Sequence, residues 1–197
     1  NKYKKKIDKI IIQKDKSMYE AIARGFNYAN GKYLTWINSD DKYYNNCLLK
    51  AVKFMLKNNV SWINGISSTL DDKKIRSVNF PYFYPRKFIK NGLCHKSKYG
   101  FIPQESVIFS KKLYYKSGGF KPSKKISGDY FLWKSFASYE DLKPINLKIG
   151  IFRKRKGQLS ENLENYYSEI GMKYKKKKIN FLRFLISFFY LLKKSKL

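Results

Sequence analysis

Two adjacent carboxylates, Asp40 and Asp41, follow the run Tyr33-Leu34-Thr35-Trp36-Ile37 and the polar pair Asn38-Ser39. The run is mostly apolar and strand-prone, so it predicts a buried strand over residues 33–37. In an alternating α/β protein, ligands bind at the loop that follows such a strand. Two carboxylates in that loop are costly unless a cation joins them, and hard divalent cations prefer oxygen ligands. The pair therefore predicts a site for a metal and a diphosphate.

The residues before this strand predict a helix that would position the loop. Ser17 and Glu20 have the spacing of a capping box, in which each side chain accepts a hydrogen bond from a free backbone N–H of the first turn. Asn30-Gly31 predicts a left-handed stop at the other end. A short apolar run at residues 9–13 predicts a buried strand ahead of the helix. Apolar residues recur at the spacing of one helix face: Met18, Ala21, Ile22, Gly25, Phe26 and Ala29.

The rest of the chain alternates between predicted strands and helices. Residues 45–57 predict a second amphipathic helix, and residues 60–63 predict a strand that ends at Asn64-Gly65. This β-α-β-α-β order indicates a parallel sheet covered by helices. The expected fold class is α/β, with a mixed, mainly parallel sheet flanked by helices. Further strands are expected at 75–80, 106–110 and 144–152, with helices at 111–116 and from Ser127-Gly128-Asp129 onward.

Composition narrows the class of protein. The 197 residues and the hydrophobic fraction of 43% indicate one domain with a sizeable core. The net charge of +29 suggests nucleic-acid binding, but only six of the 43 basic residues are Arg, the residue that dominates base and phosphate recognition. An anionic membrane surface or a nucleotide substrate explains the charge equally well.

Cysteine and histidine usage argues against a disulfide framework and against a zinc site. Cys47 and Cys94 are far apart, so they predict reduced thiols, which fits a cytoplasmic protein. His95 is the single histidine and has no partner at ligand spacing, which argues against zinc. The sequence shows no signal peptide at its start. It begins with Asn1 rather than Met, so we expect a fragment or a processed chain.

The last part of the chain differs in character. Lysines at 175–178 precede a largely apolar segment, 179–192, which is too short to span a bilayer. An in-plane amphipathic helix with basic flanks fits better, although a helix docked on the domain or on a partner fits the same pattern. One face of this helix would carry Phe181, Leu182, Leu185, Phe188, Phe189 and Leu192, and the other Arg183, Ser187, Tyr190 and Lys194.

Taken in order, these segments resemble a family 2 glycosyltransferase of the GT-A (Rossmann-like) fold. The resemblance runs from about residue 10 to 160 and rests on the ordered set of motifs, since an adjacent Asp pair alone is a weak signal. It implies a catalytic domain over residues 1–170, expected to be N-terminally incomplete, and the charge pattern described above marks residues 171–197 as a basic amphipathic tail. The matching segments are 15–25, 29–41, Pro103-Gln104, Gly118-Gly119-Phe120, 128–133 and Gly157-Gln158-Leu159-Ser160.

The resemblance implies inverting transfer of a sugar from a nucleotide-diphosphate sugar to a hydroxyl acceptor. The basic amphipathic tail suggests a glycan or lipid-linked glycan of envelope polysaccharide synthesis as that acceptor. Asp129 matches the general base, which takes the proton of the attacking hydroxyl. Mg²⁺ or Mn²⁺ on Asp40 and Asp41 would neutralise the diphosphate. Nucleotide-sugar contacts are expected from Asp15, Arg24, Asn38 and Asp40, diphosphate contacts also from residues 153–156, and acceptor contacts from Gln104 and Glu105.

The sequence also departs from the family pattern. The opening strand, which carries a nucleobase contact, would lie before Asn1, and position 38 is Asn where relatives often have Asp. An inactive truncated remnant or scaffold is therefore an alternative function, and a basic nucleic-acid binder is a third. For an active enzyme, the basic tail predicts a peripheral location at the inner face of the plasma membrane, on anionic lipid.

Overall fold

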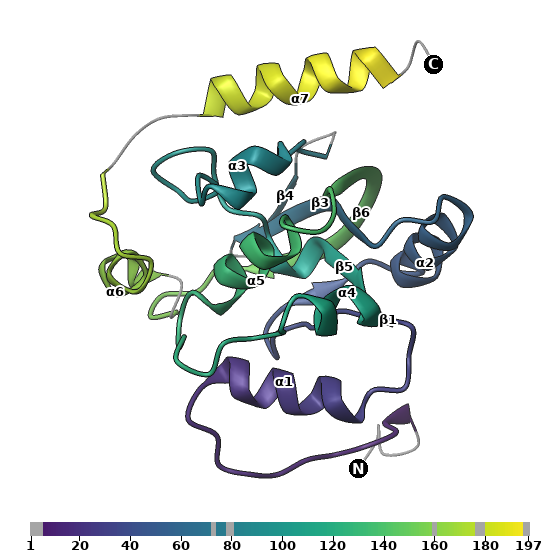
Figure 1. Cartoon of the computed structure of the whole chain (residues 1–197), viewed down its shortest axis with the longest axis vertical. Coiled ribbons are helices and arrows are strands. Elements are labelled where there is room, and N and C mark those ends of the chain that lie inside the picture. Colours follow the sequence, from purple (N-terminus) through teal and green to yellow (C-terminus); the bar gives the residue numbers. More distant parts are fainter. Residues whose placement is uncertain (1–5, 72–73, 78–80, 159–160, 176–179, 195–197) are drawn as a thin grey trace.

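The structure, a computed structural model, describes residues 6–71, 74–77, 81–158, 161–175 and 180–194. It is a mixed α/β fold in which a sheet is flanked by helices (Figure 1). The strands are β1 (Tyr33–Leu34), β2 (Lys42–Tyr43), β3 (Trp62–Asp71), β4 (Lys74–Ser77), β5 (Val107–Ser110) and β6 (Lys143–Arg153). The helices are α1 (Met18–Tyr28), α2 (Cys47–Lys57), α3 (Arg86–Lys90), the 3-10 turn η2 (Gln104–Ser106), α4 (Lys111–Lys116), α5 (Gly128–Phe136), α6 (Leu163–Glu169) and α7 (Asn180–Lys194).

The strands of the sheet lie in the order β1-β5-β3-β6-β2, with β4 paired to β3 beside this path. The mixed sheet is confirmed, but among the described pairings only β3–β6 is parallel. The expected mainly parallel arrangement is therefore wrong for this part of the chain. β5 runs antiparallel to both of its neighbours, β1 and β3.

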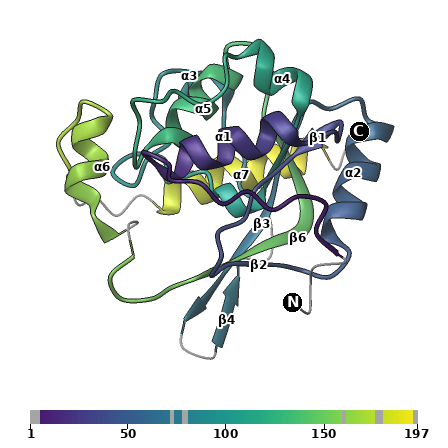
Figure 2. The same cartoon turned by 90° about the horizontal axis from the view of Figure 1, so that it is seen from below.

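Alternating side chains of the strands bury on opposite faces of the sheet, as the period of two requires. Trp62 of β3 enters a cluster with helices α1, α3, α4 and α5, whereas its neighbour Ile63 enters a second cluster with α2. Figure 2 shows α1 lying across one face and the β3–β4 hairpin projecting beyond the helices. The first cluster is strongly aromatic, with Trp36, Trp133 and Trp62 stacked in sequence at centroid distances of 5.8 Å.

The apolar run at residues 9–13 is not a strand, which corrects the expectation from its sequence. Ile10 and Ile12 are 54% and 94% exposed, and the segment is extended without a ladder. A strand needs a neighbour to accept its backbone hydrogen bonds, and no described segment pairs with this run. The run Tyr33–Ile37 likewise forms only the two-residue strand β1.

Helix α1 begins as predicted and ends differently. Ser17 Oγ accepts a hydrogen bond from the Glu20 N–H at 3.2 Å, but the Glu20 carboxylate accepts from the Lys16 N–H rather than from Ser17. Only half of the capping box is therefore formed. At the other end Ala29 is extended, and neither Asn30 nor Gly31 takes a left-handed conformation, so the predicted stop is wrong.

Gly65 does not end a strand but lies inside β3. A Cβ at this position would lie 2.5 Å from the Leu147 carbonyl oxygen of β6, and the β3–β6 register shifts just beyond it. The glycine is needed for close approach of two backbones, a known role of glycine within strands. β3 continues past this glycine to Asp71, beyond the predicted end.

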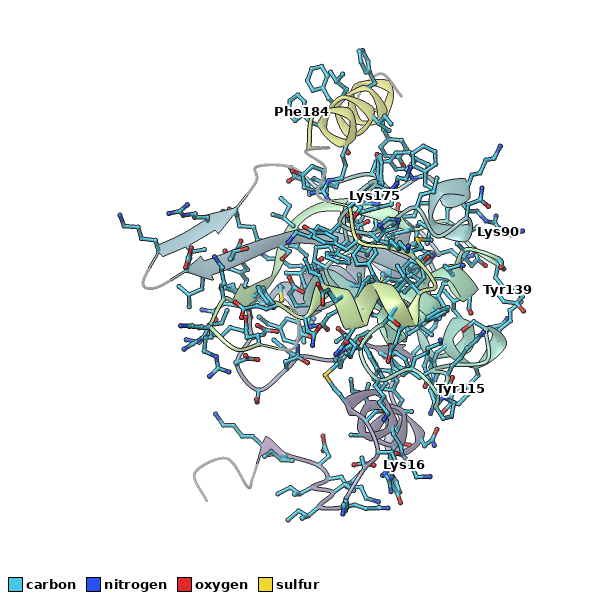
Figure 3. The ribbon with its side chains drawn as sticks, turned by 90° about the vertical axis from the view of Figure 1, so that its left-hand side faces the viewer. Lys16, Lys90, Tyr115, Tyr139, Lys175 and Phe184 are labelled. Atoms are coloured by element: carbon cyan, nitrogen blue, oxygen red, sulfur yellow. The ribbon has the colours of Figure 1, made fainter. Side chains whose placement is uncertain are left out.

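Helix α7 packs on the domain through its polar stripe. The Ser187 Oγ accepts a hydrogen bond from the Phe83 N–H at 3.0 Å, and the Arg183 guanidinium lies 3.4 Å from the centroid of the Tyr82 ring. The opposite face carries Phe184, Phe188 and Phe189, which are 41%, 46% and 63% exposed. Figure 3 shows Phe184 on the outer side of this helix, away from the sheet. The segment is helical and its described side chains divide into a polar and an aromatic face, whereas its orientation in a membrane stays a prediction; the side chains at 181, 182, 192 and 194 lie outside the described ones.

No helix in the described part of the chain is both long enough and apolar enough to cross a membrane. The division into a domain of residues 1–170 and a tail of 171–197 stays a prediction. The parts of the predicted strand and motif that fall on residues 78–80 and 159–160 lie outside the described residues.

Candidate active site

One large cavity of about 1330 Å³ opens at the ends of β3 and β6. Helix α1, the loop after β1, the η2 turn, the start of α5, the loop after β6 and helix α6 all contribute to its wall. A cavity of this size is sufficient for a nucleotide-sized ligand. The sequence-predicted residues that line it are Asn38, Asp40, Gln104, Glu105, Asp129 and Lys154–Lys156.

The two adjacent carboxylates have different surroundings. Asp40 lines the cavity, whereas Asp41 does not and is 9% exposed. The Oδ1 of Asp41 accepts from the Arg153 N–H at 2.9 Å, and its Oδ2 accepts from the Asn38 amide at 3.2 Å. Burial raises the pKa of Asp41, while the Arg153 N–H opposes this shift. Asp41 thus joins the loop after β1 to the end of β6.

Asp40 is paired with the loop that follows β6. Its Oδ2 accepts hydrogen bonds from Arg155 Nη2 at 2.6 Å and from Gln158 Nε2 at 3.1 Å. The bond from Arg155 is the main cause that lowers the pKa of the Asp40 carboxyl below its usual value. An ionised carboxylate and the basic residues 154–156 therefore meet at one side of the cavity.

Asp129 faces the same cavity from the first turn of α5. Protein atoms surround its carboxyl group on most sides, and this burial raises its pKa to about 6. Hydrogen bonds from the Tyr130 N–H at 2.8 Å and the Tyr19 hydroxyl at 3.1 Å act in the opposite direction. A carboxyl group with a pKa near 6 is ionised at neutral pH and still accepts a proton readily, as a general base requires.

Gln104 and Glu105 lie in the η2 turn beside Asp129. Both polar atoms of the Gln104 amide are buried without a hydrogen-bond partner among the described residues. Glu105 is 4% exposed and accepts a hydrogen bond from the Ser67 hydroxyl of β3. Burial raises the pKa of Glu105 to about 7, although the Ser67 bond lowers it. An unpaired buried amide is costly, so a polar ligand in the cavity is its natural partner.

Asp15 and Arg24 are not brought to the cavity. Neither lines it, and the two form an ion pair with each other on α1 and the segment before it. The expected role of these two residues in nucleotide binding has no geometric support in the described residues.

Three residues of the site were not singled out as functional from the sequence. Tyr19 reaches Asp129 from α1, Ser67 reaches Glu105 from β3, and Glu169 of α6 accepts bonds from the backbone just before Asp129. Each acts across more than 35 positions of sequence, and no local pattern marks such contacts. The one hint in the sequence is that Tyr19 lies on a predicted helix but outside its apolar face, so packing of that face does not account for it.

Comparison with known proteins identifies the class. The model of glycosyl transferase family 2 matches residues 1–118. Two structures of S. aureus TarS 1-349 share the fold. The complex with UDP-GlcNAc has a TM-score of 0.61 and 14% identity, and the match covers 85% of this chain and 49% of that chain. The structure of TarS 1-349 itself has a TM-score of 0.57 and 13% identity, and the match covers 77% of this chain and 45% of that chain. The chain thus spans about half the length of these neighbours. Comparison with curated protein sequences gives no match.

The fold and the matched family model define the class as a glycosyltransferase of the GT-A fold. The chain belongs to glycosyl transferase family 2. The likeness to TarS is low in sequence and establishes the fold alone.

The family implies a divalent cation, and the donor atoms at the cavity can be compared with that requirement. In the described residues no group of three or more acidic, His or Cys side chains could hold a metal. Mg²⁺ and similar cations, however, are often bound by one or two carboxylates together with substrate phosphates and waters. Asp40 is ionised and faces the cavity, so it fits this arrangement, whereas both oxygens of Asp41 are already hydrogen-bonded.

The raised pKa of Glu105 predicts how stability depends on pH. The folded chain holds a proton on Glu105 between its ordinary pKa of 4.5 and about 7, whereas the unfolded chain has lost it. The contribution of Glu105 to the free energy of unfolding is therefore fully present below about pH 4.5 and is lost as pH rises through about 7. At about 1.4 kcal/mol per pKa unit, this group lowers the free energy of unfolding by about 3 kcal/mol over that range. Glu105→Gln should remove this part of the fall.

The measurement is urea unfolding of both proteins between pH 4.5 and 8. Glu164→Gln is the control, because Glu164 is exposed on α6 and its substitution should leave the pH dependence unchanged. Equal slopes in the unaltered chain and in Glu105→Gln would show that Glu105 does not titrate as described.

Proposed function

We propose that this chain transfers a sugar from a nucleotide-diphosphate sugar to an acceptor hydroxyl, with inversion at the anomeric carbon. The observation that carries the proposal is the position of Asp129, a partly buried carboxylate with a raised pKa that shares one cavity with Asp40 and the basic residues after β6. Such a transfer requires a base and a group of basic residues that can bind the diphosphate, and one cavity holds both Asp129 and the residues 154–156. The TarS structure with UDP-GlcNAc supports this donor class by likeness of fold.

In the proposed reaction the acceptor oxygen attacks the anomeric carbon and Asp129 accepts its proton. The bond between that carbon and the diphosphate oxygen breaks, and negative charge grows on the leaving diphosphate. Arg155 and Lys154 border the same part of the cavity and can stabilise this charge. The unpaired Gln104 amide and the Glu105 carboxyl would contact hydroxyl groups of the acceptor.

A divalent cation, Mg²⁺ or Mn²⁺, would be held by Asp40, and when bound it supplies positive charge to the diphosphate. Asn38 lies beside Asp40 on the cavity wall and is proposed to contact the nucleotide. Asp41 would act indirectly, because its bonds to Arg153 and Asn38 hold the loop that presents Asp40.

For the acceptor we propose a glycan or lipid-linked glycan of envelope polysaccharide synthesis, reached at the cytoplasmic face of an anionic membrane. Support comes from α7, whose outward face holds exposed Phe188 and Phe189, while its polar stripe contacts the domain. Residues 171–197 contain eight lysines and no acidic residue. Aromatic side chains beside lysines are suited to the interface of an anionic bilayer.

Substitution of the base tests the reaction. Asp129→Asn keeps the size of the side chain but removes its ability to accept a proton, so transfer should fall by roughly 10²–10⁴-fold, while UDP binding stays nearly unchanged. Transfer is measured with a panel of nucleotide sugars and binding by calorimetry. Glu140→Gln, on the loop after α5, is a control for loss of an acidic side chain outside the cavity.

Unchanged turnover in Asp129→Asn would overturn the assignment of the base. If the unaltered chain binds UDP yet transfers no sugar from any donor, the non-catalytic scaffold is the better description.

Metal dependence is tested by UDP binding with Mn²⁺ and after addition of a chelator. Mn²⁺ should strengthen UDP binding by roughly tenfold or more, and Asp40→Asn should remove this gain because the cation then loses its carboxylate ligand. Arg24→Gln is the matched control, since its ion pair with Asp15 lies outside the cavity. UDP binding that is insensitive to the chelator would count against a metal at this loop.

Membrane contact is tested by sedimentation with vesicles of phosphatidylcholine alone or with phosphatidylglycerol. The chain should bind the anionic vesicles and lose binding at high salt. Replacement of Phe184, Phe188 and Phe189 by Ser should weaken binding by roughly tenfold or more, since each buried Phe contributes about 1.5–3 kcal/mol. The control replaces Leu49 and Leu56, exposed on α2. Equal binding by the triple variant would exclude α7 as the contact.

A further inference from the structure

The Tyr19 side chain crosses from α1 to the start of α5. Its hydroxyl lies 3.1 Å from both the Ile126 carbonyl oxygen and Asp129 Oδ1. Among the described residues it is the side chain that donates to the Asp129 carboxylate, and the other donor is the Tyr130 N–H. One hydroxyl thus contacts both the candidate base and the backbone that leads to it.

Packing holds the Tyr19 ring in one place. Tyr19 is 4% exposed, and its ring lies 5.0 Å from that of Phe120. On the other side is Gly128, where a Cβ would come within 2.5 Å of the Tyr19 ring atoms. A glycine is therefore needed directly before Asp129, because any larger residue would push the Tyr19 ring away from the carboxylate.

Helix α6 holds the same backbone from the other side. The Glu169 carboxylate accepts hydrogen bonds from the N–H groups of Lys125, Ile126 and Ser127 at 2.9–3.0 Å, and from the Ser127 hydroxyl at 2.8 Å. Burial alone would raise the pKa of Glu169, but these bonds, the one from Ile126 first, lower it below its usual value. Glu169 is therefore ionised at neutral pH, and charge-assisted bonds of this kind are strong.

We propose that Tyr19 and Glu169 are positioning residues for the transfer, with Tyr19 orienting the ionised Asp129 carboxylate and Glu169 holding the loop that carries it. This inference rests on the proposed role of Asp129 as the base. Tyr19 comes from α1 and Glu169 from α6, so the geometry of one carboxylate depends on two helices that are about 150 residues apart in sequence.

Other groups around Asp129 decide the expected direction of a pH effect. Tyr19 stays protonated as a donor, because burial and then the Asp129 charge raise its pKa well above the ordinary value. Glu105 of η2 and Tyr166 of α6 also couple electrostatically with Asp129. Lys125 lines the cavity from the preceding loop, and Asp41 couples to Glu105 from the far side. Of these, Tyr19 is the group that favours the ionised form of Asp129 through a hydrogen bond.

The decisive variant is Tyr19→Phe, which keeps the ring and removes the hydroxyl. The acidic limb of the pH dependence of kcat/KM should move to higher pH by roughly half a unit or more, because the ionised carboxylate loses a donor. The kcat at neutral pH should fall roughly tenfold while the KM for the donor changes little. Tyr139→Phe is the control, since Tyr139 is exposed after α5.

Glu169→Gln should give a different pattern. One amide group cannot accept the bonds that the carboxylate accepts, so kcat should fall, but the acidic limb should stay in place or move to lower pH because a nearby negative charge is removed. Glu164→Gln on the same helix is exposed and should behave like the unaltered chain.

The Asp129 pKa is also measured directly by carbon-13 NMR of its carboxyl group, which needs no turnover. A raised pKa in Tyr19→Phe supports the inference, and an unchanged pKa together with an unchanged pH profile overturns it. If Asp129→Asn retains transfer, the proposed base is wrong, whatever Tyr19 does. If Tyr19→Phe does not fold, the inference is tested with Glu169→Gln. An unchanged kcat in that variant overturns the role of Glu169 in holding the loop before Asp129.

Discussion

Asp41 joins the two loops on which the site depends. Its carboxylate accepts the Arg153 N–H at the end of β6 and the Asn38 amide in the loop after β1. A buried carboxylate must be hydrogen-bonded, because an unsatisfied charge in the interior is very costly. This requirement fixes the loop after β1 against β6, and as a result Asp40 meets Arg155 and Gln158 at the cavity.

The same principle governs the other acidic groups of the cavity. Asp129 is satisfied by Tyr19 and the Tyr130 N–H, and Glu105 by Ser67. Each carboxyl group is thus held by a partner from a different element, and burial raises the pKa of both. Gln104 differs, because its buried amide has no partner among the described residues. Two carboxyl groups that are fixed by hydrogen bonds and one amide without a partner therefore line the same cavity.

Helix α7 shows how the same sequence pattern can be satisfied in two ways. Its polar and apolar faces are visible in the sequence, and this pattern fits either an in-plane membrane helix or a helix docked on the domain or a partner. Arg183 and Ser187 contact Tyr82 and Phe83 of the domain, and the aromatic face points outward. In the described side chains α7 thus contacts the domain while its exposed aromatic residues face outward, and contact with a membrane stays a prediction.

The sequence by itself determined the elements that depend on neighbouring residues. The α4 helix, the start of α5 at Gly128 and the strand β6 lie where local propensity and turn residues place them, and the family motifs indicated the candidate base and the loop of Asp40. The tertiary structure decided what depends on distant partners: the unpaired run at residues 9–13, Gly65 within β3, the separate roles of Asp40 and Asp41, and the Tyr19 and Glu169 contacts. Hydrogen bonds and close backbone approaches between residues far apart in sequence leave no local periodicity, so they become visible only when the chain is folded.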